Sequence, residues 1–509
     1  MASAAAQDQP SLDLALRTQD ATDAYSIEAA TSSQPTDEAG QSDDSDTKAV
    51  VRLPRRSSGH LPSDLRLEAS SSLFLGALLE DFARVTRCKW WPWHEATQYS
   101  DLAGGLIGRA HIAAHAGTVA AVMRDAALAK QSEVAHGEAL HSLKKYMTES
   151  HPGSSAVSLI LVAAGLASFS LSTNAFGLPT GSPQTPGVVP AWEAHFRGIG
   201  AIMEHADPRV FARGLGAEVL FNSIPRFMWF ALRDRKGLFL DRPEWQYILQ
   251  HVRNVPFRAT IWHIAVQVPG LLQRLDILST AIRESSSEEV RLKRLRLLRI
   301  VAANIRRLNK NLDAWLSDYA VMTGHSTSQP FYERFQSPSV DSSIDKLFFQ
   351  IHFKSYDAAE IHMLYWTYKL ILATAETQTR RAIAMSSSTT DYIMRVLPQK
   401  HGKEFAELIC QSRDYWFESS AIRKEAPADA LHTCWTFPLR LAAEWFALTP
   451  AHVPELRYCF DASEKMRKSH IQGYISGYFI DLAYGPVARL LEDLKTELQV
   501  HGEHRAIHN

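Results

Sequence analysis

The chain has 509 residues, of which 46% are hydrophobic and 21% are charged, so it is long and apolar enough to bury a large core. Its 54 Lys and Arg residues against 55 Asp and Glu residues give a formal net charge of −1. This balance excludes a uniformly basic nucleic-acid binder of the histone kind. Binding to nucleic acid would therefore need a local basic patch.

Residues 1–48 contain ten acids and two bases, and Tyr25 is their one aromatic residue. Such a segment cannot bury enough apolar surface to offset the entropy lost on ordering. We therefore predict that residues 1–71 form a disordered, acidic and polar arm or linker. An inert solvated tail is the favoured interpretation of its acidity, and an acidic interaction segment is the alternative. The basic run Arg52, Arg55 and Arg56 fits nuclear import or phosphate contact.

From residue 72 onward, apolar residues recur every three to four positions, which predicts an all-α body over 72–495 and a flexible tail over 496–509. Strand-like alternation is scarce. Loops are predicted over 177–190, 325–338 and 385–390 from their breaker residues. We expect Gly198, Gly200, Gly214 and Gly216 at helix ends or turns.

The clearest element is a single long helix over residues 285–319, which starts with Ser and Glu residues that suit a helix N-terminus. Its expected buried face consists of Leu292, Leu295, Leu298, Val301, Ile305, Leu308, Leu312 and Trp315. Between Arg291 and Lys310 the helix carries eight bases and no acid. Such a face can bind phosphate, lie on a membrane surface or be a solvated flank. We favour the solvated flank, since long charged side chains are ordinary on exposed helix faces.

A second long apolar stretch, over residues 156–171, raises the question of a membrane span. A spanning helix needs about 20 predominantly apolar residues, whereas Ser158, Ser168 and Ser170 interrupt this run, and Gly and Pro follow it. We predict a buried helix followed by a loop, and no membrane partner.

The chain lacks the nucleophile elbow, the phosphate-binding loop and the dinucleotide-binding glycine pattern, so no catalytic or cofactor-binding residue is predicted. His111 and His115 lie four residues apart, which on a helix places two imidazoles on one face, as a metal site would require. No third ligand is evident, and packing or surface histidines are the favoured interpretation. An all-α metal-binding protein or enzyme that uses this pair remains the alternative.

Two other groups of side chains are candidate sites. The four cysteines Cys88, Cys410, Cys434 and Cys459 are too few for a disulfide scaffold and too far apart for a clustered zinc site, which fits a reducing compartment. The cluster of Trp90, Trp91, Trp93 and His94 is interpreted as an aromatic plug between helices, with a ligand pocket or an interface as the alternative.

One segment resembles a known family. The run Ala191-Trp192-Glu193-Ala194-His195-Phe196-Arg197-Gly198, followed by Ile199-Gly200-Ala201-Ile202-Met203, is similar to part of the fungal-specific transcription factor domain. That domain is the helical regulatory region of fungal zinc binuclear cluster transcription factors. Further positions in matching order are Gly214, Leu220, Phe221, Pro225, Arg226, Leu232, Arg233, Arg235, Phe239, Leu240, Pro243, Glu244 and Trp245. A fainter likeness continues at 271–272, 276–278, 358–372 and 434–439.

The resemblance implies an all-α transcriptional regulator of the nucleus that recognises proteins and is not an enzyme. Its implied partners are proteins of the transcription machinery or a DNA-binding partner, and a small-molecule effector and a homodimer are compatible with it. The zinc cluster is missing, because no cysteine precedes Cys88 and no C-x-x-C occurs. Without thiolates at that spacing the zinc module cannot fold, so direct sequence-specific DNA binding by this chain is not expected. We expect an upstream exon or a close paralogue to carry the missing cysteines.

Overall fold

The structure is a computed structural model, and it describes parts of the chain between residues 106 and 470. The described residues are 106, 109–110, 113–114, 116–117, 120, 126–148, 156–175, 191–252, 257–280, 287–324, 331–335, 349–386, 400–418, 430–447 and 453–470. All of them belong to one of the two units into which the chain divides, residues 77–509. The predicted arm over 1–71 and the predicted tail over 496–509 lie outside the described residues.

Helices make up nearly all of this part of the chain, which confirms the predicted all-α fold class. The first group of elements, in chain order, is α5 (Ala126–Thr148), α6 (Ala156–Ala175), α7 (Ala191–His205), η2 (Pro208–Phe211), α8 (Gly214–Asp234), η3 (Phe239–Asp241), α9 (Pro243–His251), η4 (Phe257–Ile261), α10 (Trp262–Ala265) and α11 (Gln267–Thr280). The second group is α12 (Glu288–Met322), β1 (Tyr332–Phe335), β2 (Gln350–Phe353), α13 (Tyr356–Ser386), α15 (Lys400–Gln411), α16 (Arg413–Glu418), α18 (Ala430–Phe446) and α19 (Val453–His470).

The apolar stretch after residue 156 forms α6, which packs against α7. Ile160, Leu161 and Leu166 are fully buried, so the predicted buried helix is confirmed. Within the described ranges, no helix combines the length and the apolar character that crossing a bilayer requires.

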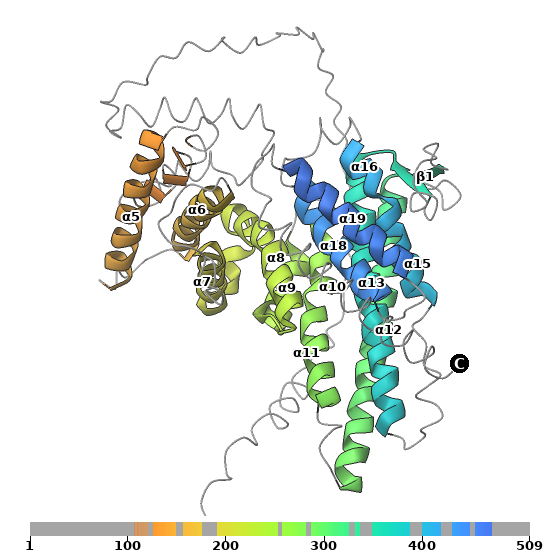
Figure 1. The fold of residues 1–509 in the computed structure, drawn as a ribbon. Helices are drawn as coiled ribbons and strands as arrows, with labels where there is room; N and C mark the ends of the chain where they lie inside the picture. Colours follow the sequence, from red (N-terminus) through yellow and green to blue (C-terminus); the bar gives the residue numbers. More distant parts are fainter. Residues whose placement is uncertain are drawn as a thin grey trace, which may run out of the picture. The chain divides into compact units, whose positions relative to one another are not determined.

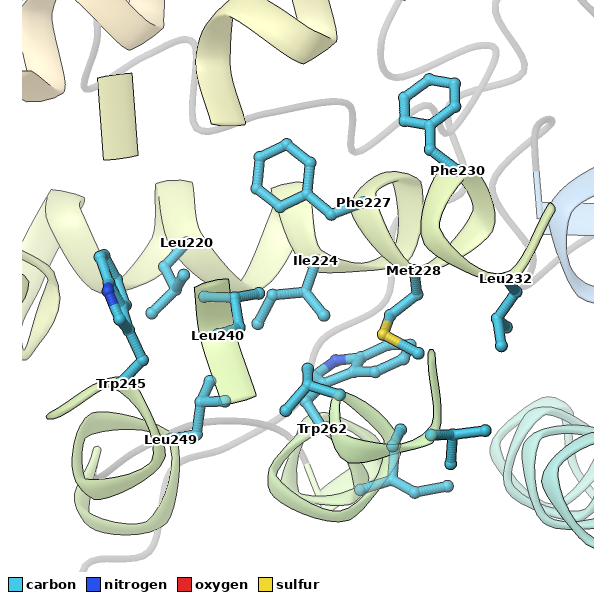
Figure 2. Packing of buried hydrophobic residues seen from close by; sticks show 14 of the residues in the cluster. Leu220, Ile224, Phe227, Met228, Phe230, Leu232, Leu240, Trp245, Leu249 and Trp262 are labelled. Atoms are coloured by element: carbon cyan, nitrogen blue, oxygen red, sulfur yellow. The ribbon is translucent and has the colours of Figure 1, made fainter. Parts of the chain in front are cut away.

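Helix α8 is apolar on two sides and is buried on both, as expected for a helix in the middle of a core. Figure 2 shows Leu220, Ile224 and Met228 on the side of α8 that faces Trp245 and Trp262. Phe227 and Phe230 project from the other side of the same helix. Contacts with α6, α7 and α11 complete the surroundings of α8.

Glycines control how closely α8 approaches its neighbours. Gly214 has a left-handed φ of 56°, and α8 begins there, which matches its predicted place at a helix end. Gly216 lies in the first turn, where a Cβ atom would meet the Val210 carbonyl oxygen at 2.1 Å. The prediction of helix ends or turns is wrong for Gly198 and Gly200, which lie inside α7. Gly200 faces Phe227, so helix packing and not chain reversal accounts for it.

The long helices α12 and α13 lie side by side (Figure 1). The prediction of one helix over 285–319 is confirmed, since α12 spans Glu288–Met322. Its buried face contains Leu298, Val301, Ile305, Leu308, Leu312 and Trp315, as predicted. The prediction is wrong for Leu292, which is 55% exposed, and Leu295 is only half-buried. At 100° per residue Leu292 points about 120° away from Leu298, whereas Ile305 differs from Leu298 by only about 20°.

A second core cluster forms where α13 meets α15, α16, α18 and α19, and Trp416 and Trp445 are buried in it. A small antiparallel hairpin covers this region, with Tyr332 opposite Phe353 and Phe335 opposite Gln350. The predicted loop over 325–338 is therefore wrong at β1, and the loop predicted from residue 385 begins too early, because α13 reaches Ser386. A four-residue strand is too short for periodicity to reveal it.

The hairpin is held to α13 by an aromatic cluster around a buried histidine. The His362 ring lies 5.6 Å from the Tyr332 and Trp366 rings and 5.9 Å from the Phe353 ring, between ring centroids. Its Nδ1 lies 2.8 Å from the Ala358 carbonyl oxygen, which can accept a hydrogen bond from it. Burial lowers the pKa of His362 to about 4, so the ring is neutral near pH 7.

Replacing Gly216 by alanine should destabilise the fold by about 1–3 kcal/mol, because the new methyl group would overlap the Val210 carbonyl oxygen. Gly198→Ala is the matched control. It lies inside α7, no atom stands within 4 Å of its Cβ position, and the substitution should be neutral or stabilising by about 0.5–1 kcal/mol. Urea unfolding of both variants measures the difference, and equal unfolding free energies would contradict the packing described here.

Acidification should destabilise the protein partly through His362. Between the ordinary value of 6.5 and the folded value of about 4, the unfolded state binds a proton that the folded state does not, so stability falls as pH falls. From pH 7 to pH 5 this one group should cost about 2 kcal/mol. His362→Phe should shrink the loss in unfolding free energy between these two pH values by that amount. An unchanged pH dependence would show that His362 is not buried in its neutral form.

Candidate functional site

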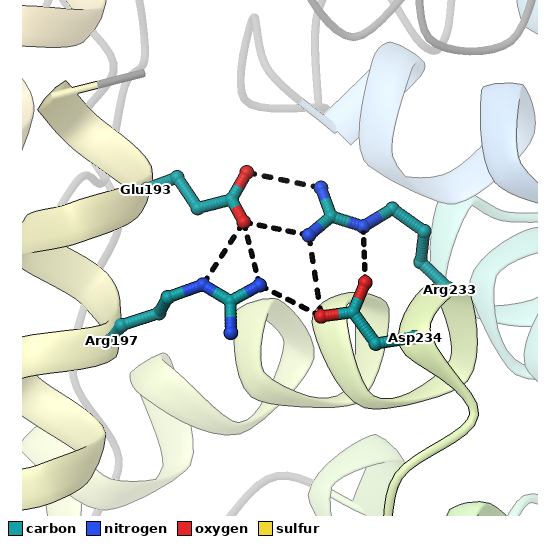
Figure 3. A network of polar contacts seen from close by, with 4 residues as sticks. All are labelled: Glu193, Arg197, Arg233 and Asp234. Atoms are coloured by element: carbon teal, nitrogen blue, oxygen red, sulfur yellow. Dashed lines mark hydrogen bonds and ion pairs between the residues drawn. The ribbon is translucent and has the colours of Figure 1, made fainter. Parts of the chain in front are cut away.

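Four charged side chains meet where α7 crosses α8, and we call them the charged quartet: Glu193, Arg197, Arg233 and Asp234 (Figure 3). Arg233 donates to both Glu193 carboxylate oxygens, at 3.0 and 2.6 Å. Arg197 donates to Glu193 Oε1 at 3.0 and 2.8 Å and to Asp234 Oδ2 at 2.7 Å. Arg233 also donates to Asp234 Oδ1 at 2.8 Å, which closes the ring of contacts.

Glu193 is the innermost member, with only 4% of its side chain exposed. Burial by itself raises the pKa of a carboxyl group, but hydrogen bonds and charge from Arg233 and Arg197 outweigh it here. The pKa of Glu193 therefore lies below its ordinary value, and the side chain is ionised near pH 7. An isolated carboxylate at this depth would be strongly unfavourable, so the packing of α7 on α8 needs a guanidinium group beside Glu193, and Arg233 is the less exposed of the two.

An aromatic layer supports the two arginines of the charged quartet. The Arg233 guanidinium carbon lies 5.0 Å from the Trp229 ring centroid and 5.4 Å from that of Phe230. Arg197 lies 5.6 Å from the Phe230 ring, and Trp192 stacks on the same ring at 5.7 Å. These contacts fix the guanidinium planes against apolar surface, where cation–π attraction is stronger than in water.

Arg235, two residues after Arg233, links the end of α8 to two more helices, α11 and α13. Arg235 ends α8 in the left-handed conformation, with φ 49° and ψ 48°, which is uncommon for a residue other than glycine. Its guanidinium donates to both carboxylate oxygens of Asp276 on α11, at 2.6 and 2.7 Å, and to Gln378 Oε1 on α13 at 3.2 Å. The bidentate ion pair offsets the cost of the strained backbone.

The charged quartet has two positive and two negative charges, so it is neutral as a group, and both Glu193 oxygens already accept hydrogen bonds. Its chemistry is that of a structural junction and not of a site for a charged ligand. No local pattern in the sequence marks Glu193, Arg197, Arg233 or Arg235 as a site. All of them nevertheless belong to the stretch over 191–245 that carries the family resemblance, and the structure brings Glu193, Arg197 and Arg233 into contact.

A second charged surface lies on α12, where the charges are not balanced. Helix α12 carries eight bases between Arg291 and Lys310. Arg291 pairs with Glu288, Arg307 donates to Gln267 Oε1 at 2.8 Å, and Arg294 is buried. The remaining five are exposed, and we call them the basic face of α12: Lys293, Arg296, Arg299, Arg306 and Lys310. None of the five forms an ion pair or hydrogen bond with another described residue.

Most of the histidines, aromatic residues and cysteines predicted as candidates lie outside the described residues. His111, His115 and the cluster at Trp90, Trp91, Trp93 and His94 lie outside the described residues, as does Cys88. The side chain of Cys434 is not described either. Cys410 and Cys459, distant in sequence, lie together in the second core with their Sγ atoms 3.5 Å apart, and burial raises the pKa of Cys459.

Two further histidines, which the sequence did not single out, also meet. The rings of His136 on α5 and His195 on α7 lie 6.2 Å apart between centroids, and burial lowers the pKa of both. Among the described residues, no three His, Cys, Asp or Glu side chains are placed to hold a metal ion.

Comparisons with protein-family models, with curated proteins and with solved structures find no match to this chain.

Replacing Glu193 by glutamine should destabilise the protein by about 2–4 kcal/mol, because the two arginines would keep their charges without the carboxylate that balances them. Arg197→Gln should cost less than about 1 kcal/mol, since 47% of that side chain is exposed and water can replace the lost contacts. Urea unfolding near pH 7 compares the two variants. Equal losses would contradict the inner position assigned to Glu193, and a double-mutant cycle with Arg233→Gln should show strong coupling.

Proposed function

We propose that this chain is a transcriptional regulator that acts in the nucleus as a helical regulatory and protein-interaction module of the fungal zinc-cluster type. The observation that carries the proposal is that side chains from the stretch with the family resemblance meet at one junction, where α7 packs on α8. Glu193 and Arg197 from α7 meet Arg233 from α8, and these side chains come from the stretch whose sequence resembles that regulatory domain.

The contacts at this junction suit a module that works by recognition. Arg235 connects the end of α8 to Asp276 on α11 by an ion pair and to Gln378 on α13 by a hydrogen bond. Together with the ion pair of Arg233 with Glu193 on α7, these contacts join four helices. A protein or small effector that binds one of these helices would act on the others through this junction. The partners in this proposal are proteins of the transcription machinery or a DNA-binding protein that supplies the sequence-specific contact.

A tethering experiment tests the function directly. The full chain, fused to a heterologous DNA-binding domain in a fungal host, should raise or lower transcription of a reporter that carries the matching sites by several-fold. The controls are the DNA-binding domain alone and a reporter without the sites. Unchanged reporter output in both directions, with the fusion protein present in the nucleus at the level of the control, would contradict the proposal.

A further inference from the structure

The basic face of α12 is the largest unbalanced set of charges on any one described helix. From Lys293 to Lys310 it extends over about 26 Å at 1.5 Å per residue. Four of its members, Arg296, Arg299, Arg306 and Lys310, point within about 80° of one another around the helix axis. The nearest following acid in the helix is Asp313, and it is already bound by the Tyr365 hydroxyl at 2.6 Å and by Lys369 at 2.9 Å.

A membrane surface is disfavoured as the partner of this face. A helix that lies on a bilayer inserts its apolar side between the lipids. The apolar side of α12 is already buried in the core, where Leu298, Ile305 and Leu312 are inaccessible to solvent. The helix packs there against α11 and α13. Along the basic face, from residue 293 to residue 310, no large apolar side chain is exposed.

An acidic protein helix is disfavoured for a related reason. Amphipathic helices bind through apolar side chains at intervals of three and four residues, which need an apolar groove. On the stripe that carries the bases, Leu292 lies at one end and Ala303 near the middle, and both are exposed. Two isolated apolar residues about 16 Å apart along the axis do not form such a groove.

We propose that the basic face of α12 binds the phosphate backbone of double-stranded DNA without reading its sequence. Duplex DNA is a stiff polyanion with one charge per about 1.7 Å of its axis, so it presents many phosphates along a face of this length. Guanidinium groups match phosphate oxygens well, and three of the five bases are arginines. This goes beyond the proposed function, in which a partner supplies the DNA contact, because here the chain itself would add an electrostatic one.

Binding to the phosphate backbone should depend steeply on salt concentration. Contacts to Z phosphates give a slope of about −0.9Z in a plot of log affinity against log salt concentration. With four or five bases engaged, affinity should fall by about 150- to 500-fold between 50 and 200 mM salt. Two unrelated duplexes should bind equally well, because backbone contacts do not depend on base sequence.

Fluorescence anisotropy with the full chain and two labelled duplexes of about 20 base pairs tests this. The triple variant Arg296→Gln, Arg299→Gln and Lys310→Gln should bind at least tenfold more weakly at 50 mM salt, and its salt slope should be smaller by about 2.7. The matched control is Arg209→Gln, Arg213→Gln and Lys236→Gln, which removes three exposed bases from other elements and should keep the slope. Circular dichroism verifies that both variants fold.

A charge-retaining variant separates loss of charge from damage to the helix. Arg296→Lys with Arg299→Lys keeps both charges and should keep most of the affinity and the salt slope. No binding of the unmodified chain at 50 mM salt would overturn the proposal, as would equal weakening in the two triple variants. Tighter binding to single-stranded RNA, to vesicles of phosphatidylserine and phosphatidylcholine or to a poly-glutamate peptide, at equal salt, would also overturn it.

Discussion

The N-terminal half of the described structure depends on the burial of one carboxylate, that of Glu193. Glu193 cannot lie between α7 and α8 unless its charge is balanced, and Arg233 and Arg197 provide that balance. The same turn of α8 that supplies Arg233 then directs Arg235 toward Asp276, which places α11 relative to α8. The apolar contacts of α8 shown in Figure 2 belong to the same helix that carries these ion pairs.

The two charged regions differ in whether other described residues match their charges. The charged quartet is neutral as a group and rests on an aromatic layer, so it contributes to structure. Among the described residues, no carboxylate pairs with the basic face of α12, and the core occupies the opposite side of the helix. Unmatched surface charge does little for stability but gives a long-range attraction to a polyanion. The same chemical groups therefore serve packing in one place and recognition in the other.

Local sequence predicted part of the candidate sites. The excess of bases between Arg291 and Lys310 was visible in the sequence, and so was the resemblance that contains Glu193 and Arg233. Which bases remain exposed depends on partners elsewhere, because Arg307 is bound by Gln267 and Arg291 donates to the Ser386 carbonyl oxygen. The ion pair of Arg233 with Glu193 joins residues 40 apart, and no local pattern indicates such a distance.

By itself, the sequence determined the all-α class, the long helix near 285–319, the buried helix after residue 156 and most of the buried face of α12. These features depend on helical period and breaker residues, which act over a few neighbouring positions. Tertiary structure alone decided that Leu292 is exposed, that Gly200 lies inside a helix against Phe227 and that Cys410 meets Cys459. Each of these depends on which distant segment supplies the neighbouring atoms, because burial and pairing are properties of the packed chain and not of its local period.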